Sequence, residues 1–437
     1  MKKICVWGLW HLGSVTAACL AEHFPTVGCD PDADAIRRLG QGHAPLAEHG
    51  LDELIKTGIA SGRLSFTSKL AGALRNADLI WVTFDTPVND KDKADYGFIR
   101  NRISRLFPHL KEGALVAISS QVPVGFTAQV EHSYRKRFPR RRVSFAYLPE
   151  NLRLGQALDA FRHPARIVAG VRQAKDRERL ALMLAPFSRS IEWMSVESAE
   201  MTKHALNAFL GMSVAFANEM AALAERVGAD AKEIERGLKS DERIGPRAYL
   251  APGSAFAGGT LARDITFLEH LGRQKKAPTP LMSAVMASNE AHKSWPQHKI
   301  KELLGRLWGK KIAVLGLTYK PGTDTLRRSS AIELCRWLAT HRAQVHAYDP
   351  AISKLPRPLE RMINLCSKIE EALHRADALY LATAWPVFRE LSAGQIASLM
   401  RRTIVIDPNR FLEFSLAGRS NITYAAVGRH LSSNHEA

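Results

Sequence analysis

The chain has 437 residues and a mass of 48.4 kDa, which is too long for one ordinary hydrophobic core and predicts two or three domains. Its 46% hydrophobic and 24% charged residues are typical of a folded globular protein and exclude disordered, collagen-like and low-complexity classes. Lysine and arginine total 61 against 43 acidic residues, and the resulting net charge of +18 attracts anions such as phosphorylated metabolites, nucleic acids or acidic lipids. Charge alone does not choose among these partners.

The five cysteines have no spacing typical of a zinc site or a redox pair, so we interpret them as reduced thiols of the core and expect no metal. The apolar run from Ile4 to Trp7 is broken by Gly8 and His11, which argues against a signal peptide. No later stretch approaches the roughly 20 apolar residues of a membrane span. We therefore expect a cytoplasmic protein that makes no membrane contact.

Short apolar runs alternate with amphipathic segments of helix length through the first half, a pattern typical of βαβ units and a parallel sheet. The strands expected there are residues 3–9, 26–30, 79–84, 115–120, 143–147 and 166–170. A helical composition follows from about residue 195 to 292 and begins with a long helix over 198–227. Strand patterns return at 310–317, 344–348, 378–383 and 403–407. The chain is therefore predicted to be α/β, with two parallel-sheet domains flanking a helical middle and a ligand cleft between domains.

The first predicted strand runs into a glycine turn, Gly8 to Gly13, and then into a helix rich in small residues. This is the context of a dinucleotide fingerprint, in which the pyrophosphate lies at the helix N-terminus. Asp30 ends the second strand, where an acidic residue binds a ribose hydroxyl and disfavours a 2′-phosphate, so NAD is favoured over NADP. Trp10 stands where the fingerprint has its middle glycine, and a nucleotide-free βαβ turn is the alternative.

Within the long helix, Glu200, Lys203 and Asn207 share one face. A lysine and an amide in partly apolar surroundings can bind a developing oxyanion, and desolvation can lower the pKa of the lysine towards use as a general base. The alternative is a polar stripe exposed to solvent.

A glycine-rich segment, residues 253–259, precedes another helix. Its backbone amides can wrap phosphate oxygens, and Arg243 and Arg263 add positive charge. A flexible linker is the alternative.

In the last domain, residues 317–324 follow a predicted strand and would suit a second nucleotide phosphate. The alternative is that Ser329 or Ser330 simply caps the helix that follows.

The basic run 135–142 is interpreted as a solvated helix end and turn. Contact with nucleic acid is the less favoured interpretation, because no array of aromatic residues for base stacking accompanies the run.

Taken together, these segments resemble the UDP-glucose/GDP-mannose dehydrogenase family over essentially the whole chain. The most specific matches are Pro149-Glu150 with Leu152-Arg153 and Pro164-x-Arg166-Ile167-Val168, then Ala199-Glu200-x-x-Lys203-x-x-x-Asn207, and finally Lys320-Pro321-x-Thr323-Asp324-x-x-Arg327. Val122-Pro123-x-Gly125 and Thr383-x-Trp385-x-x-Phe388 support the match.

The resemblance implies two Rossmann-like domains joined by a helical centre: an NAD-binding domain over 1–195, a central dimerisation domain over 196–300 and a UDP-binding domain over 301–437. It implies NAD-dependent oxidation of a UDP-hexose such as UDP-glucose at the C6 alcohol by a homodimer. The residues that it assigns to catalysis are Lys203, Asn207, Asp264, Glu150 and Thr260. Those assigned to the cofactor are Gly8, Trp10, Leu12, Gly13, Asp30, Thr86, Gln121 and Arg327. Those assigned to the substrate are Leu152, Arg243, Tyr249, Phe256, Gly258 and Lys320.

Family members oxidise the alcohol twice, through an aldehyde that a cysteine holds as a thiohemiacetal and then a thioester. Here the cysteine position carries Thr260, and an alcohol is a far weaker acid than a thiol of pKa about 8.5. Gln121 replaces a threonine that positions water, Leu154 replaces a second carboxylate, and Arg263 replaces a lysine. We therefore expect a reaction that stops at the aldehyde or oxidises the hydrated aldehyde directly. A catalytically silent homologue that binds nucleotide sugar or NAD is the alternative.

Overall fold

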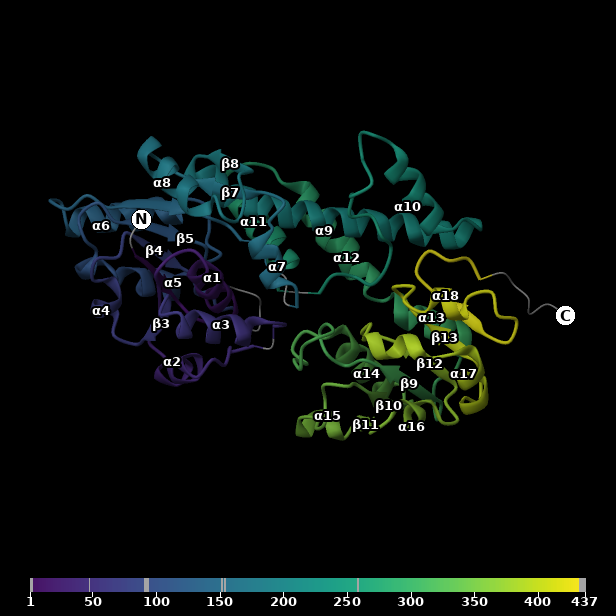
Figure 1. Cartoon of the computed structure of the whole chain (residues 1–437). Helices are drawn as coiled ribbons and strands as arrows, with labels where there is room; N and C mark the ends of the chain where they lie inside the picture. Colours follow the sequence, from purple (N-terminus) through teal and green to yellow (C-terminus); the bar gives the residue numbers. More distant parts are fainter. Residues whose placement is uncertain are drawn as a thin grey trace. The chain divides into compact units, whose positions relative to one another are not determined.

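The computed structural model describes residues 3–46, 48–89, 94–150, 152, 155–257 and 259–431. The chain forms two compact units, residues 1–205 and 206–437, and each unit contains one large sheet (Figure 1). The three-domain boundaries expected from the sequence, near residues 195 and 300, stay a prediction.

The first unit is built on an eight-stranded sheet in the order β3-β2-β1-β4-β5-β6-β7-β8. The strands are β1 (Ile4–Trp7), β2 (Thr26–Cys29), β3 (Leu64–Thr67), β4 (Leu79–Val82), β5 (Leu115–Ile118), β6 (Ser144–Tyr147), β7 (Ile167–Gly170) and β8 (Ile191–Met194). All pairs are parallel except β6 and β7, which meet antiparallel at Tyr147 and Gly170. The order 3-2-1-4-5-6 is that of doubly wound dinucleotide-binding sheets.

Helices cover both faces of this sheet. Alternate residues of β1 point to opposite faces and therefore pack in two separate cores. Cys5 and Trp7 pack in the core that α5 (Tyr96–Ser104) and α6 (Phe126–Arg137) complete. Ile4 and Val6 pack in the core that α1 (His11–Ala21), α3 (Leu51–Ala60) and α8 (Ala174–Leu184) complete. The helices of this unit are α1 (His11–Ala21), α2 (Ala33–Gly40), α3 (Leu51–Ala60), α4 (Leu70–Leu74), α5 (Tyr96–Ser104), the 3₁₀ helix η1 (Phe107–His109), α6 (Phe126–Arg137), α7 (Ala157–Arg162) and α8 (Ala174–Leu184).

The long helix expected from the sequence is α9 (Val196–Val227), which begins in the first unit and continues into the second. By length and composition alone it could cross a membrane, a test that the core helix of a soluble protein also passes. The expected absence of a membrane span therefore stays a prediction. The helices that follow are α10 (Ala231–Ser240), α11 (Leu261–Lys275), α12 (Pro280–His292) and α13 (Trp295–Leu304).

The second unit contains a six-stranded, fully parallel sheet in the order β11-β10-β9-β12-β13-β14, which repeats the topology 3-2-1-4-5-6. Its strands are β9 (Lys311–Leu315), β10 (Gln344–Tyr348), β11 (Ile363–Leu365), β12 (Ala378–Leu381), β13 (Ile404–Ile406) and β14 (Thr423–Ala425). Its helices are α14 (Ser330–Thr340), α15 (Arg357–Glu360), α16 (Ile369–Leu373), the 3₁₀ helix η2 (Pro386–Glu390), α17 (Ala393–Leu399) and α18 (Glu413–Leu416). The predicted fold class, two Rossmann-like sheets with a helical region between them in sequence, is confirmed.

Ligands of doubly wound sheets bind outside the carboxyl ends of the strands. In the first sheet those ends lead directly to residues expected in the site. Gly8 follows β1, Asp30 follows β2, Thr86 follows β4, Gln121 follows β5 and Glu150 follows β6. The topology thus brings residues that are far apart in sequence to one edge of the sheet.

Candidate active site

The turn between β1 and α1 requires both of its glycines. Gly8 has a φ of +104°, and a Cβ added to Gly13 would lie 1.7 Å from the carbonyl oxygen of Gly8. The hydroxyl of Thr83 donates to the same carbonyl oxygen at 2.6 Å. Strand and helix therefore approach so closely that a side chain at either glycine would force them apart.

Trp10 occupies the N-cap position of α1 with a φ of −75°, a conformation that does not need glycine. Its side chain makes no capping hydrogen bond and is 47% exposed. The amides in the first turn of α1, which include that of Leu12, consequently have no side-chain cap. An uncapped helix N-terminus behind a tight glycine turn fits the pyrophosphate of NAD.

Asp30 holds the turn from the neighbouring strand. Its carboxylate accepts hydrogen bonds from the amide of Leu9 at 2.8 Å and from the amide of Asp32 at 2.9 Å. The side chain remains partly exposed at the carboxyl end of β2, and its contact with a ribose hydroxyl stays a prediction. Thr86 and Gln121 are also brought together, because the Thr86 hydroxyl donates to the Gln121 carbonyl at 2.6 Å.

The polar face of α9 is not a solvated stripe, so that alternative is wrong. Glu200 and Asn207 are buried, and Lys203 is half-buried. The Lys203 ammonium donates to the backbone carbonyl of Glu150, whose own carboxylate accepts from the amide of Leu152. Three residues expected in the site, Lys203, Glu150 and Leu152, therefore meet in the first unit.

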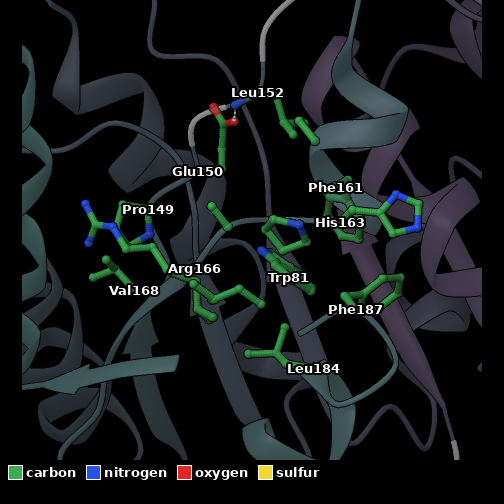
Figure 2. A pocket seen from close by; sticks show the side chains of 15 residues that line it. Trp81, Pro149, Glu150, Leu152, Phe161, His163, Arg166, Val168, Leu184 and Phe187 are labelled. Carbon is green, nitrogen blue, oxygen red and sulfur yellow. Dashed lines mark hydrogen bonds between the residues drawn. The ribbon is translucent and has the colours of Figure 1, made fainter. Parts of the chain in front are cut away.

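A largely apolar cavity of about 380 Å³ lies beside Glu150 and Leu152 (Figure 2). Trp81, Phe161 and Phe187 are among the side chains that line it. The indole of Trp81 donates to Ser119, and the Ser119 hydroxyl donates to the carbonyl of Leu148, so this wall is tied to the ends of β5 and β6. Asn151, Arg153 and Leu154, which complete the sequence motif here, lie outside the described residues.

Glu48 was not expected in the site, yet it connects the cofactor turn to the segment after Glu150. Its carboxylate lies 3.0 Å from Nε2 of His11, the first residue of α1. It also accepts from the amides of Gly155 at 2.8 Å and Ala157 at 2.9 Å. Burial acts to raise the pKa of Glu48, but these three hydrogen bonds outweigh it and hold the pKa below its ordinary value.

In the second unit, the amide of Asn207 donates to the buried carboxylate of Asp264. Asp264 lies in the first turn of α11, and Nε of Arg263 is 3.9 Å from its other oxygen. Thr260 is exposed at the N-cap of α11 and makes no capping hydrogen bond with its side chain. The structure thus joins Asn207 to Asp264, one turn of helix after Thr260.

Residues 253–257 are not a flexible linker. The amide of Gly253 donates to Asn218 and the amide of Ser254 donates to Asn409, both at 2.9 Å. Asn289 accepts from the amide of Phe256 and donates to its carbonyl, again at 2.9 Å each. His292 also contacts the carbonyl of Gly253. These side chains already use the amides of Gly253, Ser254 and Phe256. That the remaining amides of the segment wrap phosphate oxygens stays a prediction.

The sequence did not single out these three asparagines, although each is a polar residue in or beside an apolar segment. The ring of Phe256 is buried with Ala208, Ala215 and Ile265, so its side chain serves the core of this loop. Gly258 lies outside the described residues. Gly259, with a φ of +113°, faces the guanidinium of Arg328.

The other residues expected to bind substrate lie at the surface or in half-buried loops. Arg243 is exposed and pairs with Asp241 at 2.7 Å, and Tyr249 is exposed. Lys320 is half-buried and Arg327 is exposed, both between β9 and α14. Their contacts with nucleotide stay predictions.

None of the five cysteines is a surface thiol, since all are free and buried. Burial raises the pKa of Cys19, Cys29 and Cys335 to about 12 and raises the pKa values of Cys5 and Cys366 as well. A thiolate is therefore strongly disfavoured at each position.

The chain matches three models of the UDP-glucose/GDP-mannose dehydrogenase family: the NAD binding domain at residues 2–188, the central domain at 197–291 and the UDP binding domain at 313–413. It is 32% identical to the UDP-glucose 6-dehydrogenase of Pseudomonas aeruginosa, and the alignment covers 98% of this chain and 97% of that protein. It is 34% identical to the UDP-glucose 6-dehydrogenase of Rickettsia conorii, with coverage of 96% and 98%.

Solved structures of nucleotide-sugar dehydrogenases are also similar to this chain over almost its whole length. The structure of a UDP-glucose dehydrogenase from Pyrobaculum islandicum is similar with a TM-score of 0.86 and 28% identity, covering 98% of each chain. A UDP-D-ManNAc dehydrogenase structure from Pyrococcus horikoshii is similar in fold, with a TM-score of 0.84, 24% identity, and coverage of 98% of this chain and 99% of that one.

Proposed function

The chain belongs to the UDP-glucose/GDP-mannose dehydrogenase family and is an NAD-dependent nucleotide-sugar dehydrogenase, and from this premise we propose that it oxidises the C6 alcohol of a UDP-hexose such as UDP-glucose and stops at the aldehyde. The balanced reaction is R–CH₂OH + NAD⁺ → R–CHO + NADH + H⁺. NAD, when bound, supplies the hydride acceptor.

Lys203 and Asn207 carry the proposed chemistry from one face of α9, one helical turn apart. The Lys203 ammonium stabilises the alkoxide or, when neutral, takes the hydroxyl proton, and Asn207 donates to the same oxygen. Glu150 holds the lysine through its backbone carbonyl, and Asp264 orients the amide of Asn207. Gly8, Leu12, Gly13 and Asp30 hold the cofactor. This assignment extends the contacts described above to a bound substrate.

The observation that carries the proposed arrest is the absence of a usable thiol. Thr260 stands at the motif position where family members have cysteine, and each of the five cysteines is buried inside an α/β core. The second oxidation of the family passes through a thioester, which needs a thiol. A threonine hydroxyl can offer only a hemiacetal and an oxygen ester in its place, and without an activating base it does not form them at a useful rate. Without covalent capture, the aldehyde leaves after one hydride transfer.

The test counts NADH formed per UDP-glucose consumed and identifies the product by mass after trapping the aldehyde with hydroxylamine. One equivalent of NADH and a trapped aldehyde are expected. Two equivalents and a uronate would refute the arrest, and no NADH with any UDP-hexose would support the catalytically silent homologue instead. Lys203→Ala should abolish NADH formation, whereas Lys232→Ala, at an exposed position on α10, should leave it unchanged.

A matched pair at residue 260 tests the missing thiol directly. Thr260→Cys places a thiol at the exposed N-cap of α11, and Thr260→Ser keeps a hydroxyl there. Intact-mass analysis during turnover should detect a covalent sugar adduct in the cysteine variant alone. An adduct on wild-type protein would contradict the proposed noncovalent course.

We also propose that the chain acts as a homodimer through α9. Phe209, Phe216 and Leu223 recur every seven residues on this helix and are 58%, 44% and 54% exposed. A regular apolar stripe of this kind is the seam by which helices pair, and exposed large apolar patches are rare on monomers. The stripe therefore supports a second copy of the chain as the partner.

A further inference from the structure

We propose that Glu200 and His204 are positioning residues of the dehydrogenase site, which hold the loop that carries Gln121 against the helix that carries Lys203. The inference rests on family membership and needs the proposed substrate only for its kinetic test. Neither residue is assigned to substrate or cofactor above, and both are almost completely buried.

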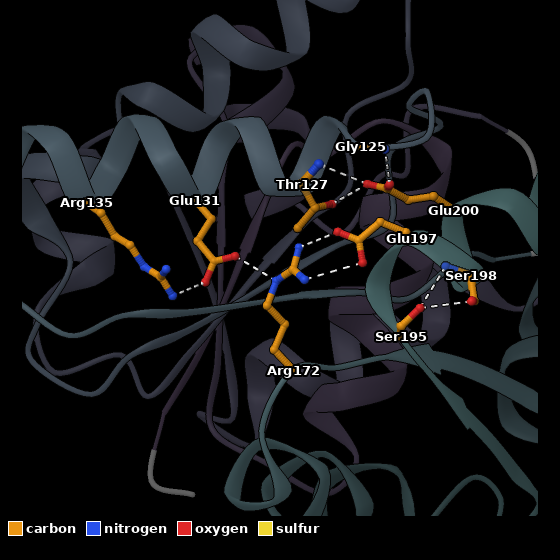
Figure 3. A network of polar contacts seen from close by, with 9 residues as sticks. All are labelled: Gly125, Thr127, Glu131, Arg135, Arg172, Ser195, Glu197, Ser198 and Glu200. Carbon is orange, nitrogen blue, oxygen red and sulfur yellow. Dashed lines mark hydrogen bonds and ion pairs between the residues drawn. The ribbon is translucent and has the colours of Figure 1, made fainter. Parts of the chain in front are cut away.

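Glu200 caps a helix that is far from it in sequence (Figure 3). Its carboxylate accepts from the amide of Gly125 at 2.5 Å, the amide of Thr127 at 2.9 Å and the hydroxyl of Thr127 at 2.6 Å. Gly125 is the N-cap of α6, has a φ of +88° and lacks a side chain that could cap the helix itself. The carboxylate from α9 therefore takes the place of a local cap and meets the positive end of the α6 dipole.

His204 holds the same loop one turn further along α9. Its Nε2 lies 3.0 Å from the carbonyl oxygen of Val122. The neighbouring carbonyl, that of Gln121, accepts from Thr86. The carbonyls of Gln121 and Val122 are thus bound by two different side chains, those of Thr86 and His204. Together these contacts fix the backbone at Gln121.

The three residues Glu200, Lys203 and His204 act from one side of α9. Glu200 and His204 contact the loop after β5, and Lys203 contacts the segment after β6 through Glu150. The helix thereby sets the distance between Lys203 and Gln121. Hydride transfer demands such control, since a displacement of about 1 Å can cost about 100-fold in rate.

Burying the Glu200 carboxylate costs free energy, because the charge loses its hydration. Burial raises the pKa of Glu200 above its ordinary value, although its hydrogen bonds act in the opposite direction. A side chain on α6 itself could cap that helix without burying a charge. What the long-range carboxylate adds is a fixed relation between α6, the loop before it and α9.

The same two helices are also joined by an ion-pair chain that does not touch the loop, and this provides a control. Arg172 contacts Glu131 of α6 at 2.7 Å and Glu197 of α9 at 2.6 Å (Figure 3). Glu197→Gln therefore weakens the contact between the helices at a more exposed position and leaves Gly125, Thr127 and Val122 with their partners.

The first experiment is hydrogen exchange on the full chain without cofactor. Glu200→Gln keeps the size of the side chain but offers one strong acceptor in place of two carboxylate oxygens. Peptides covering residues 119–130 should exchange about ten-fold faster in this variant and at the wild-type rate in Glu197→Gln. Equal protection in wild type and Glu200→Gln would overturn the proposal.

The second experiment measures turnover of UDP-glucose and of its C6-deuterated form. In Glu200→Gln we expect kcat to fall about ten-fold, the KM for UDP-glucose to stay within about two-fold and the isotope effect to rise, because hydride transfer becomes more rate-limiting. His204→Leu should behave alike, and His204→Gln, which keeps a donor for the Val122 carbonyl, should recover most of the rate. A fall in kcat of the same size in Glu197→Gln would show that the residues act only on stability.

If Glu200→Gln does not fold, Thr127→Val removes one donor to the same carboxylate and Thr127→Ser restores it. The valine variant should then show the faster exchange and the larger isotope effect, and the serine variant should not. If wild type turns over no UDP-hexose, the proposed function fails, while the exchange experiment still decides whether Glu200 holds the loop.

Discussion

Asn289 offers a measurable test of how the loop before Thr260 is held. The side chain is buried on α12 and makes two hydrogen bonds of 2.9 Å to the amide and the carbonyl of Phe256. Asn289→Ala leaves both backbone groups without a partner next to a buried ring. Each unsatisfied buried group costs about 1–3 kcal/mol, so opening of the loop should become easier by about 2–6 kcal/mol.

Native-state hydrogen exchange of peptides covering residues 253–257 measures this directly. Since about 1.4 kcal/mol corresponds to a factor of ten, exchange should accelerate by about 30-fold or more. Asn289→Leu keeps the volume but not the hydrogen bonds and should exchange as fast as the alanine variant. Glu290→Gln changes an ion pair at the surface between α12 and its C-cap residue Lys293, and its exchange should stay within about two-fold of wild type.

Two results would refute this reasoning. Exchange in Asn289→Ala within about three-fold of wild type would mean that the two hydrogen bonds do not hold the loop. Wild-type exchange in Asn289→Leu would mean that filled volume, and not hydrogen bonding, does so.

Two further predictions concern Glu48 and the apolar stripe of α9. Glu48→Gln should raise the KM for the UDP-sugar about three- to ten-fold, because one amide oxygen cannot serve Gly155 and Ala157 together. The folded-state pKa of Glu48 lies below the ordinary 4.5, so its stabilisation is fully present above pH 4.5 and is lost as the pH falls through the lower value; melting temperatures of wild type and variant should converge only in that acid range. Phe216→Glu should convert a dimer into monomers in sedimentation experiments, whereas Leu182→Glu, at an exposed apolar position on α8, should not; a monomeric wild type would contradict the proposed dimer.

The central strands were predictable because they are continuous apolar runs. β1, β4 and β5 are buried at every position, as expected for strands covered on both faces. β3, β8, β11 and β14 escaped prediction. All four are three or four residues long and lie at sheet edges. In β3, β8 and β11, half-buried or exposed side chains also weaken the apolar signal. The antiparallel pairing of β7 with β6 was likewise beyond the hydrophobic pattern, which does not encode strand direction.

The sequence predicted which residues form the candidate site but not which groups they contact. Motif spacing pointed to Lys203, Glu150, Asn207 and Asp264, but the partner of Lys203 is a backbone carbonyl, which no residue pattern reveals. Glu48 bonds to residues more than 100 positions later in the chain. Such contacts depend on the register of whole elements and become visible only when the fold is assembled.

The hydrogen bond from the Ser254 amide to the Asn409 side chain ties the loop before Thr260 to the six-stranded sheet. Asn409 follows β13 of the six-stranded sheet, while Ser254 lies on the segment that leads to Thr260 and Asp264. A displacement of the chain just after β13 would therefore act on the segment before Thr260 through one side-chain hydrogen bond.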